Sequence, residues 1–162
     1  MLIASFGLGL LALTLLFDGW LDEQSNPNRE PVTTQDSSGA RLVELQRSRQ
    51  GHYLSAGAIN GVAVTFLLDT GATDVTVPAN LARQAGLEPG TASRAATANG
   101  VVTVYSTRID KLELGTISLT DIRASITPSM EGDTILLGMS ALREIEFSQR
   151  GSTLTLRQLP GY

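Results

Sequence analysis

The stretch from Phe66 to Thr73, which reads FLLDTGAT, limits what this chain can fold into more than any other stretch. Its three large apolar residues indicate a buried strand, and Asp69 follows where that strand should end. An ionised carboxylate that is removed from water without a partner is costly in free energy. Asp69 is therefore either an ordinary turn residue, since turns select Asp and Gly, or a residue kept in a costly place to do chemistry.

Composition excludes several classes of site. The chain has 162 residues, a length typical of one domain with an additional segment. Its 12 basic and 16 acidic side chains give a net charge of −4, which argues against a nucleic-acid partner. Without cysteine, and with His52 as its single histidine, the sequence excludes thiol catalysis, disulfides and multi-histidine metal sites. No pattern indicates a cofactor, and we expect His52 at the surface or at the start of a strand.

Residues 1–17 read MLIASFGLGLLALTLLF and contain no charged side chain. This length is close to the lower limit for a helix that spans a bilayer. Because a basic start and a small-residue cleavage site are both missing, an uncleaved anchor is favoured over a signal peptide, and a buried core helix is the remaining alternative. We expect a transmembrane anchor over residues 1–21, with Trp20 at the lipid headgroups. The acidic flank beyond it favours a single-pass membrane protein whose remainder lies on the periplasmic or exported side.

The rest of the chain divides into a polar segment and a strand-rich segment. Residues 22–41 contain little that can be buried, which predicts a flexible linker. From residue 42 to 162, short apolar runs separated by turn residues predict an all-β domain with one or two short helices. Asn60-Gly61 and Asn99-Gly100 each lie between apolar runs, which is the strongest short-range signal for a β-hairpin. The return strand of the first hairpin leads directly to Asp69.

A second stretch, residues 134–141 with the sequence TILLGMSA, is similar to FLLDTGAT. Both have an apolar strand end that is followed by a glycine-containing turn and small residues. Such internal similarity suggests two half-units related by approximate symmetry, each sending one apolar strand into a common core. Only the first of the two turns carries an Asp.

Taken in order, FLLDTGAT, the glycine-tipped hairpin TANGVV and the later segment ILLGMSAL resemble the retropepsin-like aspartic proteases. The resemblance is strongest to their bacterial, membrane-anchored branch, and it extends over roughly residues 51–159. It implies a single-lobed retropepsin-like acid protease barrel over residues 42–162, preceded by an N-terminal transmembrane helix. It also implies that the chain is an aspartic endopeptidase that cleaves a protein or peptide substrate and needs no cofactor.

The resemblance also implies roles for individual residues. Asp69 would be the catalytic carboxylate, and Thr70 would direct its hydroxyl across a dimer axis to the partner chain. Gly71 would leave room for its backbone N–H beside the carboxylates, and Ala72 completes the catalytic loop. A flap that closes over the substrate would be formed by Ala98, Asn99, Gly100 and Val101.

Position 73 departs from the retroviral members of the family. Thr73 stands where those members usually carry an Asp that holds the substrate backbone. The next residue, Asp74, is therefore the candidate for that role.

General acid–base hydrolysis of a peptide bond requires two carboxyl groups. One takes a proton from water while the other gives a proton to the substrate, and two carboxyls that share one proton can fill both roles. Because the chain carries the Asp-Thr-Gly triplet once, the second carboxyl is expected from another copy in a two-fold homodimer. The alternatives within the chain lack that motif and are expected at the surface or in turns: Asp74, Asp110, Asp121 and Asp133. A non-catalytic module that binds an extended peptide in the same cleft is the competing function.

Overall fold

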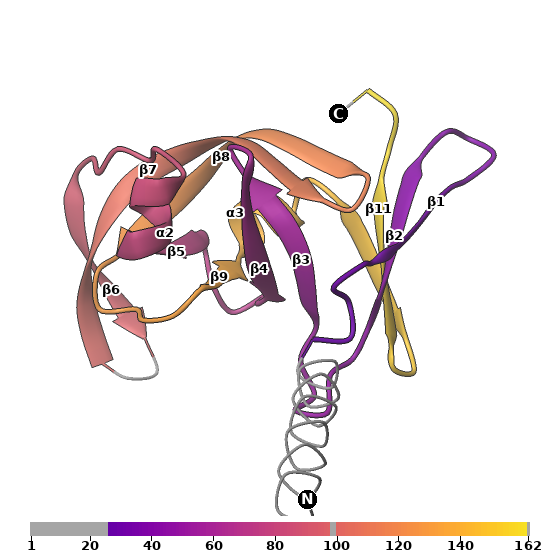
Figure 1. Cartoon of the computed structure of the whole chain (residues 1–162), viewed down its shortest axis with the longest axis horizontal. Coiled ribbons are helices and arrows are strands. Elements are labelled where there is room, and N and C mark those ends of the chain that lie inside the picture. Colours follow the sequence, from indigo (N-terminus) through magenta and orange to yellow (C-terminus); the bar gives the residue numbers. More distant parts are fainter. Residues whose placement is uncertain (1–25, 98–99, 162) are drawn as a thin grey trace, which may run out of the picture.

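The computed structural model describes residues 26–97 and 100–161, and the regular structure in these residues is almost entirely β-strand (Figure 1). The strands are β1 (Val32–Gln35), β2 (Arg41–Gln46), β3 (Leu54–Ile59), β4 (Val62–Leu68), β5 (Val75–Pro78), β6 (Ala92–Thr97), β7 (Gly100–Leu114), β8 (Ile117–Thr127), β9 (Thr134–Leu137), β10 (Glu146–Arg150) and β11 (Thr153–Gln158), and the helices are α2 (Ala79–Gln84) and α3 (Met139–Leu142). The predicted all-β class with two short helices is confirmed.

The strands form two sheets. The smaller sheet has the order β1-β2-β11-β10, and the larger has the order β3-β4-β9-β5-β8-β7-β6. The larger sheet closes on itself because β3 also pairs with β7, where Ala58 lies opposite Glu113. Gly57 allows this close approach, since a Cβ atom at this position would lie 2.3 Å from the Glu113 carbonyl oxygen and 2.5 Å from the Phe66 ring. The result is a small barrel with a separate sheet beside it.

The first predicted hairpin forms as expected. Asn60 and Gly61 connect β3 to β4 with φ values of 48° and 81°, the left-handed conformation that Asn and Gly tolerate best. The alternation of buried positions along both arms then directs large apolar side chains into one core. This core includes Ile59, Phe66, Val75, Val77, Ile109, Leu112, Ile135, Leu137, Leu142 and Leu156.

The two similar stretches identified in the sequence lie side by side. Strands β4 and β9 pair in parallel, with Phe66 opposite Ile135 and Leu68 opposite Leu137. Because parallel strands end at the same edge of a sheet, the turn after β4 and the turn after β9 emerge together. This arrangement places Asp69 directly beside the start of helix α3 at Met139.

The structure corrects the predicted flexible linker (22–41) over residues 26–41. Strand β1 pairs with β2 along its whole length, since Val-Thr-Thr is a sequence that suits a strand. Asn28 is 3% exposed, and its amide Nδ2 donates to the carbonyl oxygens of Gln46 and Leu54 at 2.9 and 2.7 Å. The segment therefore folds onto the ends of β2 and β3 instead of standing free.

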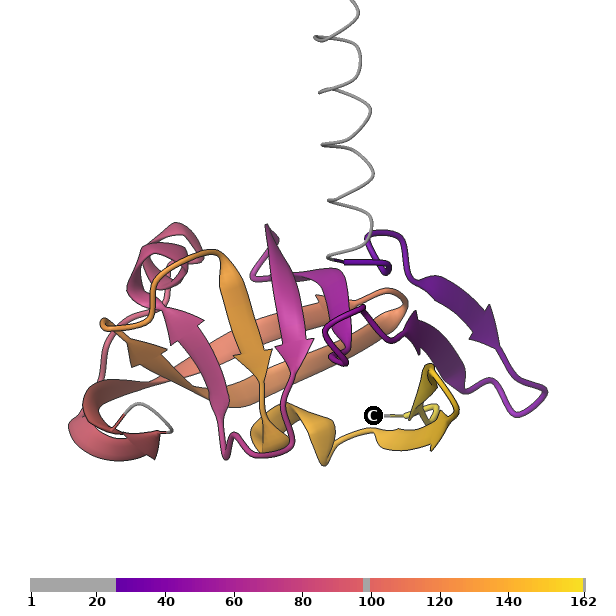
Figure 2. The same ribbon diagram turned by 90° about the horizontal axis from the view of Figure 1, so that it is seen from below.

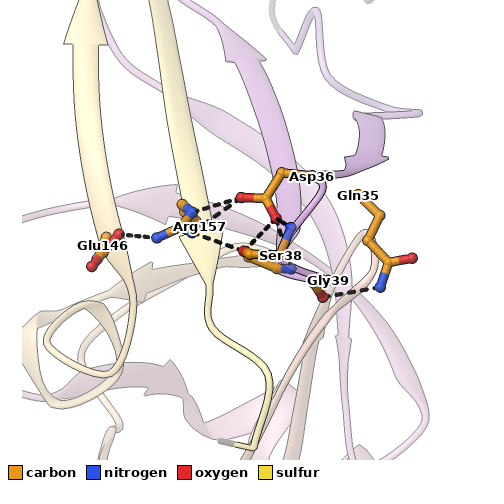
Figure 3. Close-up of polar contacts among 7 residues, drawn as sticks. Gln35, Asp36, Ser38, Gly39, Glu146 and Arg157 are labelled. Atoms are coloured by element: carbon orange, nitrogen blue, oxygen red, sulfur yellow. Dashed lines mark hydrogen bonds and ion pairs between the residues drawn. The ribbon is translucent and has the colours of Figure 1, made fainter.

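The turn after β1 is also attached to the domain. The Arg157 side chain on β11 binds the Asp36 carboxylate and the Ser38 hydroxyl on one side, and the Glu146 carboxylate of β10 on the other (Figure 3). The turn after β1, strand β11 and strand β10 are thus held together at one end of the small sheet.

The predicted anchor (1–21) lies outside the described residues and stays a prediction. Within residues 26–97 and 100–161, no helix combines the length and the apolar character needed to cross a membrane.

Candidate active site

Asp69 lies at the point where β4 ends, as its sequence context predicts. Its backbone N–H donates to the Leu137 carbonyl oxygen at 3.1 Å, which continues the pairing of β4 with β9 by one residue. Its backbone carbonyl accepts from the Ala72 N–H at 3.2 Å and closes a tight turn over Thr70 and Gly71. The position of the Asp69 backbone is therefore fixed by the sheet.

The Asp69 carboxylate is half-buried in the single chain. Its Oδ1 atom accepts a hydrogen bond from the Gly71 N–H at 2.9 Å. A Cβ atom at position 71 would lie 3.1 Å from the same oxygen, so a residue larger than glycine would crowd the carboxylate. Thr70 is exposed and Ala72 is half-buried. The four residues thus form a short turn that holds one acid group at the surface of the described chain.

Helix α3 supports this turn from behind. The backbone N–H groups of Met139 and Ser140 donate to the carbonyl oxygens of Ala72 and Thr73 at 2.8 and 2.9 Å. Gly138 lies so close that a Cβ atom there would be 2.3 Å from the Asp74 carbonyl oxygen and 2.7 Å from that of Ala72. Glycine is required at position 138 because the two turns touch through their backbones.

Ser140 connects three elements at this site, and the sequence offered no signal for it. Its side chain is buried, and Oγ accepts from the Val75 N–H at 2.9 Å and donates to the Arg123 carbonyl oxygen at 2.7 Å. The hydroxyl therefore ties α3 to both β5 and β8. A serine after Gly-Met at the start of a short helix is unremarkable in sequence, and only the folded arrangement reveals these partners.

Asp74 is already engaged within the chain. Its Oδ1 atom accepts from the Arg123 Nε at 2.7 Å, and its side chain is 28% exposed. Sequence reasoning made Asp74 the candidate to hold a substrate backbone in place of Thr73. In the structure, its carboxylate forms an ion pair that attaches the segment between β4 and β5 to β8.

The other candidate carboxylates also have different surroundings. Asp121 forms a two-pronged ion pair with Arg108, and this hydrogen-bonded contact lowers the pKa of Asp121. Asp110 and Asp133 are exposed. None of these three lies in the turn after β4 or in the turn after β9, so they do not complete an acid pair with Asp69 in the described chain. Among residues 26–97 and 100–161, no three acidic or histidine side chains lie together in a way that could hold a metal ion.

The second predicted hairpin is formed by β6 and β7. Of its four predicted flap residues, Ala98 and Asn99 lie outside the described residues. Gly100 begins β7 with a φ of 111°, and its carbonyl oxygen accepts from the Thr97 hydroxyl at 2.8 Å. Val101 is 57% exposed, which is a high value for an apolar side chain. Strand β7 pairs with β8 from Tyr105 onward, and the exposed Val101 lies near the start of β7, before that pairing begins.

Comparison with known proteins identifies one family and one shared fold. Residues 55–144 match the family model described as "gag-polyprotein putative aspartyl protease", a range that spans more than half of the chain and includes both turns. A protein of Sinorhizobium sp., described as an uncharacterized protein in the cobV 5′ region, is 31% identical over 135 residues, or 81% of this chain. That match spans 58% of the relative's own length.

A solved structure shows the same architecture, and a second one matches more weakly. A retropepsin-like aspartic protease from Rickettsia conorii superposes with a TM-score of 0.63 at 22% identity, covering 77% of this chain and 97% of that one. The EIAV protease complexed with the inhibitor HBY-793 matches with a TM-score of 0.47 at 17% identity, over 59% of this chain and 88% of that one. The Rickettsia match establishes the fold.

Proposed function

The chain belongs to the retropepsin-like aspartic proteases, and from this membership we infer that it is an aspartic endopeptidase whose active site forms between two copies of the chain. The family supports hydrolysis of peptide bonds by aspartate in general. The finer proposal is that Asp69 of each copy supplies one half of a catalytic pair.

The observation that carries the proposal is the contrast between the two adjacent turns. The turn after β4 presents Asp69, whereas the turn after β9 presents Gly138, packed against the backbone of Ala72 and Asp74. One described chain therefore holds one suitably placed acid. Acid–base hydrolysis requires two, and a two-fold axis beside Asp69 would supply the second from an identical chain.

The proposed reaction uses the two carboxyls in opposite protonation states. The ionised one takes a proton from water as the water oxygen bonds to the substrate carbonyl carbon, and the protonated one gives its proton to the carbonyl oxygen. When the tetrahedral intermediate collapses, the C–N bond breaks and the amine leaves with a proton from the pair. Because the carboxyls share one proton, a pH profile would report the pair and not a single Asp69.

The remaining residues of the site have supporting roles in this proposal. Thr70 is exposed and positioned beside Asp69, which suits contact with a partner chain. The Gly71 N–H already donates to the carboxylate. The hairpin of Ala98, Asn99, Gly100 and Val101 would cover a bound peptide, and the exposed Val101 would offer it an apolar contact.

Membrane attachment is part of the proposal. Residues 1–17 would anchor the chain as a single span, with the protease domain on the periplasmic or exported side. The folded segment 26–41 shortens the distance between such an anchor and the domain, so the enzyme would act on substrates close to the membrane surface.

Replacing Asp69 by Asn tests the proposal directly. Asp69→Asn preserves the shape of the side chain but removes its acid–base chemistry, and we expect cleavage of an unstructured protein to fall by about 10³-fold or more. The assay uses the full chain in detergent from acidic to neutral pH, and Asp110→Asn, at an exposed position, is the matched control. Activity of Asp69→Asn equal to that of the parent would refute the proposal that the chain is an aspartic endopeptidase that uses Asp69. A peptide that is bound but never cut by the parent would identify the chain as a peptide-binding module.

A further inference from the structure

A second surface groove lies between β8 and α3, away from the Asp69 carboxylate. This groove, the β8 groove, is lined by residues 119–123 of β8, by Arg108 of β7, and by Ser140, Arg143 and Glu144 in and just after α3. Its volume is about 420 Å³, a size typical of ligand sites. Figure 2 shows the long β7–β8 hairpin crossing the domain with α3 beside it, and the Ser140 hydroxyl joins α3 to β8.

The β8 groove follows the edge of a strand. Residues 119–123 are consecutive, and successive side chains of a strand point to opposite faces of a sheet, so a groove that touches all of them runs along the strand edge. Among the described residues, β5 pairs with β8 only over Ala124–Thr127. Before that stretch, the Gln158 side chain donates to the Ser118 carbonyl oxygen at 2.7 Å. Between these two contacts the edge of β8 has no strand beside it in the described chain, and such an edge can bind a new strand.

The β8 groove is basic, although the chain as a whole has a net charge of −4. Arg108 lies directly opposite Arg123 in the pairing of β7 with β8, and like charges in this position destabilise a sheet unless other groups offset them. Arg143, at the end of α3, contributes a third guanidinium group. Two acids, Asp121 and Glu144, line the same groove. The lining therefore has an excess of positive charge.

Two of these arginines can accept a further carboxylate. Arg123 binds Asp74, and Arg143 binds Glu144, each through its Nε atom. Within residues 26–97 and 100–161 their terminal nitrogens make no other hydrogen bond, although the guanidinium group is suited to hold a carboxylate with two parallel N–H groups. The two arginine side chains are 51% and 59% exposed, and ion pairs at such positions are weak. A carboxylate of a ligand can therefore join these pairs or replace them.

The pairing of β7 with β8 is interrupted beside the arginines. Asp110 and Asp121 fall opposite each other, and they are the one position between Arg108 and Lys111 at which the two strands do not pair. Asp121 has a φ of 55°, which is strained for a residue with a side chain, and its carboxylate turns to Arg108. Local distortions of this kind within a strand are frequent next to binding sites.

We propose that the β8 groove binds an extended, acidic peptide segment of a partner protein. The peptide adds as a strand to the edge of β8 between Ser118 and Arg123, and its carboxylates bind Arg108, Arg123 and Arg143. Alternate side chains of a strand share one face, so a peptide with an acid at every second residue presents its carboxylates to the arginines together. A peptide fits better than a small anion because the arginines stand beside an open strand edge. This site goes beyond the proposed function and does not depend on catalysis by Asp69.

Binding of a labelled peptide of alternating Glu and Thr tests the proposal. The full chain carrying Asp69→Asn is used in detergent, so that the peptide is not cut, and fluorescence anisotropy measures binding. We expect the dissociation constant to rise about tenfold when every Glu of the peptide is replaced by Gln, and about fivefold for Arg143→Gln. Arg83→Gln, at an exposed position of α2 outside the groove, is the matched control and should leave the dissociation constant unchanged.

Glu144→Gln should have the opposite effect to Arg143→Gln. It removes an acid that competes for Arg143 and repels the peptide, so we expect the dissociation constant to fall about twofold. Loss of folded protein cannot produce tighter binding. If neither substitution changed the affinity, the peptide would lie elsewhere, as in the cleft at Asp69, and the β8 groove would be overturned.

A change in the peptide backbone tests strand addition. N-methyl groups along the Glu-Thr peptide remove its backbone donors, and we expect the dissociation constant to rise about tenfold. Equal binding of the methylated peptide would overturn strand addition. Displacement of the peptide by glutarate or inorganic phosphate at the same molar concentration and ionic strength would identify a small-anion site and overturn it as well. Each of these outcomes leaves the proposed enzyme standing, because that proposal depends on the loss of cleavage in Asp69→Asn.

Discussion

Two turns in this chain begin with the same kind of sequence and do different work. Asp36 opens the turn DSSGA after β1, and Asp69 opens the turn DTGA after β4. Each places an acid at the end of a strand, and each follows it with a hydroxyl residue and a glycine. The comparison between them separates an aspartate that holds structure from one that is available for chemistry.

The Asp36 carboxylate is occupied by its own chain. It accepts from the Ser38 hydroxyl at 2.5 Å, from the N–H groups of Ser38 and Ala40 at 2.8 and 3.0 Å, and from the Arg157 Nε at 3.1 Å (Figure 3). These bonds, that of the Ser38 hydroxyl most of all, outweigh partial burial and lower the pKa of Asp36 to about 2. Such an acid stays ionised at neutral and mildly acidic pH, and both of its oxygens are engaged by bonds within its own chain.

The Asp69 carboxylate differs from that of Asp36 in the groups that bind it. It receives the Gly71 N–H, and the stabilising contacts of its turn come from backbone groups of α3 that bind Ala72 and Thr73. The contacts between α3 and the turn therefore hold the turn in place without involving the Asp69 carboxylate. This difference predicts that changes behind the Asp69 turn should impair activity, whereas changes in the Asp36 turn should affect stability alone.

Gly138→Ala is expected to have the largest effect on stability. The new Cβ would lie 2.3 Å from the Asp74 carbonyl oxygen, and both atoms belong to paired backbone segments that cannot move independently. We expect a loss of about 3 kcal/mol in the free energy of unfolding, the upper part of the range for an overpacked core. Urea unfolding of the full chain measures this loss, and cleavage by the remaining folded protein should fall as well.

Gly39→Ala is the matched substitution in the other turn. Gly39 has a φ of 83°, so alanine is strained there, but its nearest neighbour would be the Pro160 side chain at 3.5 Å. We expect a cost of about 1 kcal/mol with unchanged activity per folded molecule. If Gly138→Ala were no more costly than Gly39→Ala, the backbone contact between the two turns would not support the site as described.

Much of the barrel could be predicted because its signals are local. Asn60-Gly61 specifies a hairpin by backbone conformation alone, and the apolar runs on either side of it specify the buried face. The similarity of FLLDTGAT to TILLGMSA was also visible in the sequence, and the structure pairs those strands in parallel. What these features share is that neighbouring residues determine them.

The prediction of a flexible linker failed because residues 26–41 are ordered by contacts with residues that are distant in sequence. Asn28 is held by Gln46 and Leu54, which lie 18 and 26 residues away, and β1 is stable only because β2 is beside it. Composition alone makes residues 22–41 resemble an unstructured segment. The same limit explains why Asp36 was not singled out, since its decisive partner, Arg157, is 121 residues away.

The candidate site was predicted in part for the same reason. Asp69 follows from its own strand and turn, but Ser140 and Arg123 acquire their roles only when α3, β5 and β8 meet. Their contacts are to backbone atoms and to a single carboxylate. Residue type alone does not indicate such contacts.

Ser140→Ala is expected to have an intermediate effect. It removes the acceptor of the buried Val75 N–H and the donor to the Arg123 carbonyl, and leaving such groups without a partner costs about 2 kcal/mol. Because Ser140 positions the Asp69 turn without touching a substrate, kcat should fall more than KM rises. Ser93→Ala, at an exposed position on β6, should change neither quantity. A loss of stability with unchanged kcat would make Ser140 a structural residue only.

Asp36→Asn is expected to have the smallest effect on activity and the clearest dependence of stability on acid. Because folding lowers the pKa of Asp36 from 3.8 to about 2, its ionised form stabilises the fold above about pH 4, and this contribution is lost as the pH falls through 2. The parent should therefore lose stability between pH 4 and pH 2 more steeply than Asp36→Asn, in which the side chain at position 36 does not titrate. Thermal unfolding at half-unit pH intervals measures the two slopes, with Asp133→Asn, at an exposed loop position, as the control. Parallel slopes would show that the Arg157 network does not depend on the charge of Asp36, and the distinction between an occupied and an available aspartate would then rest on Asp69 alone.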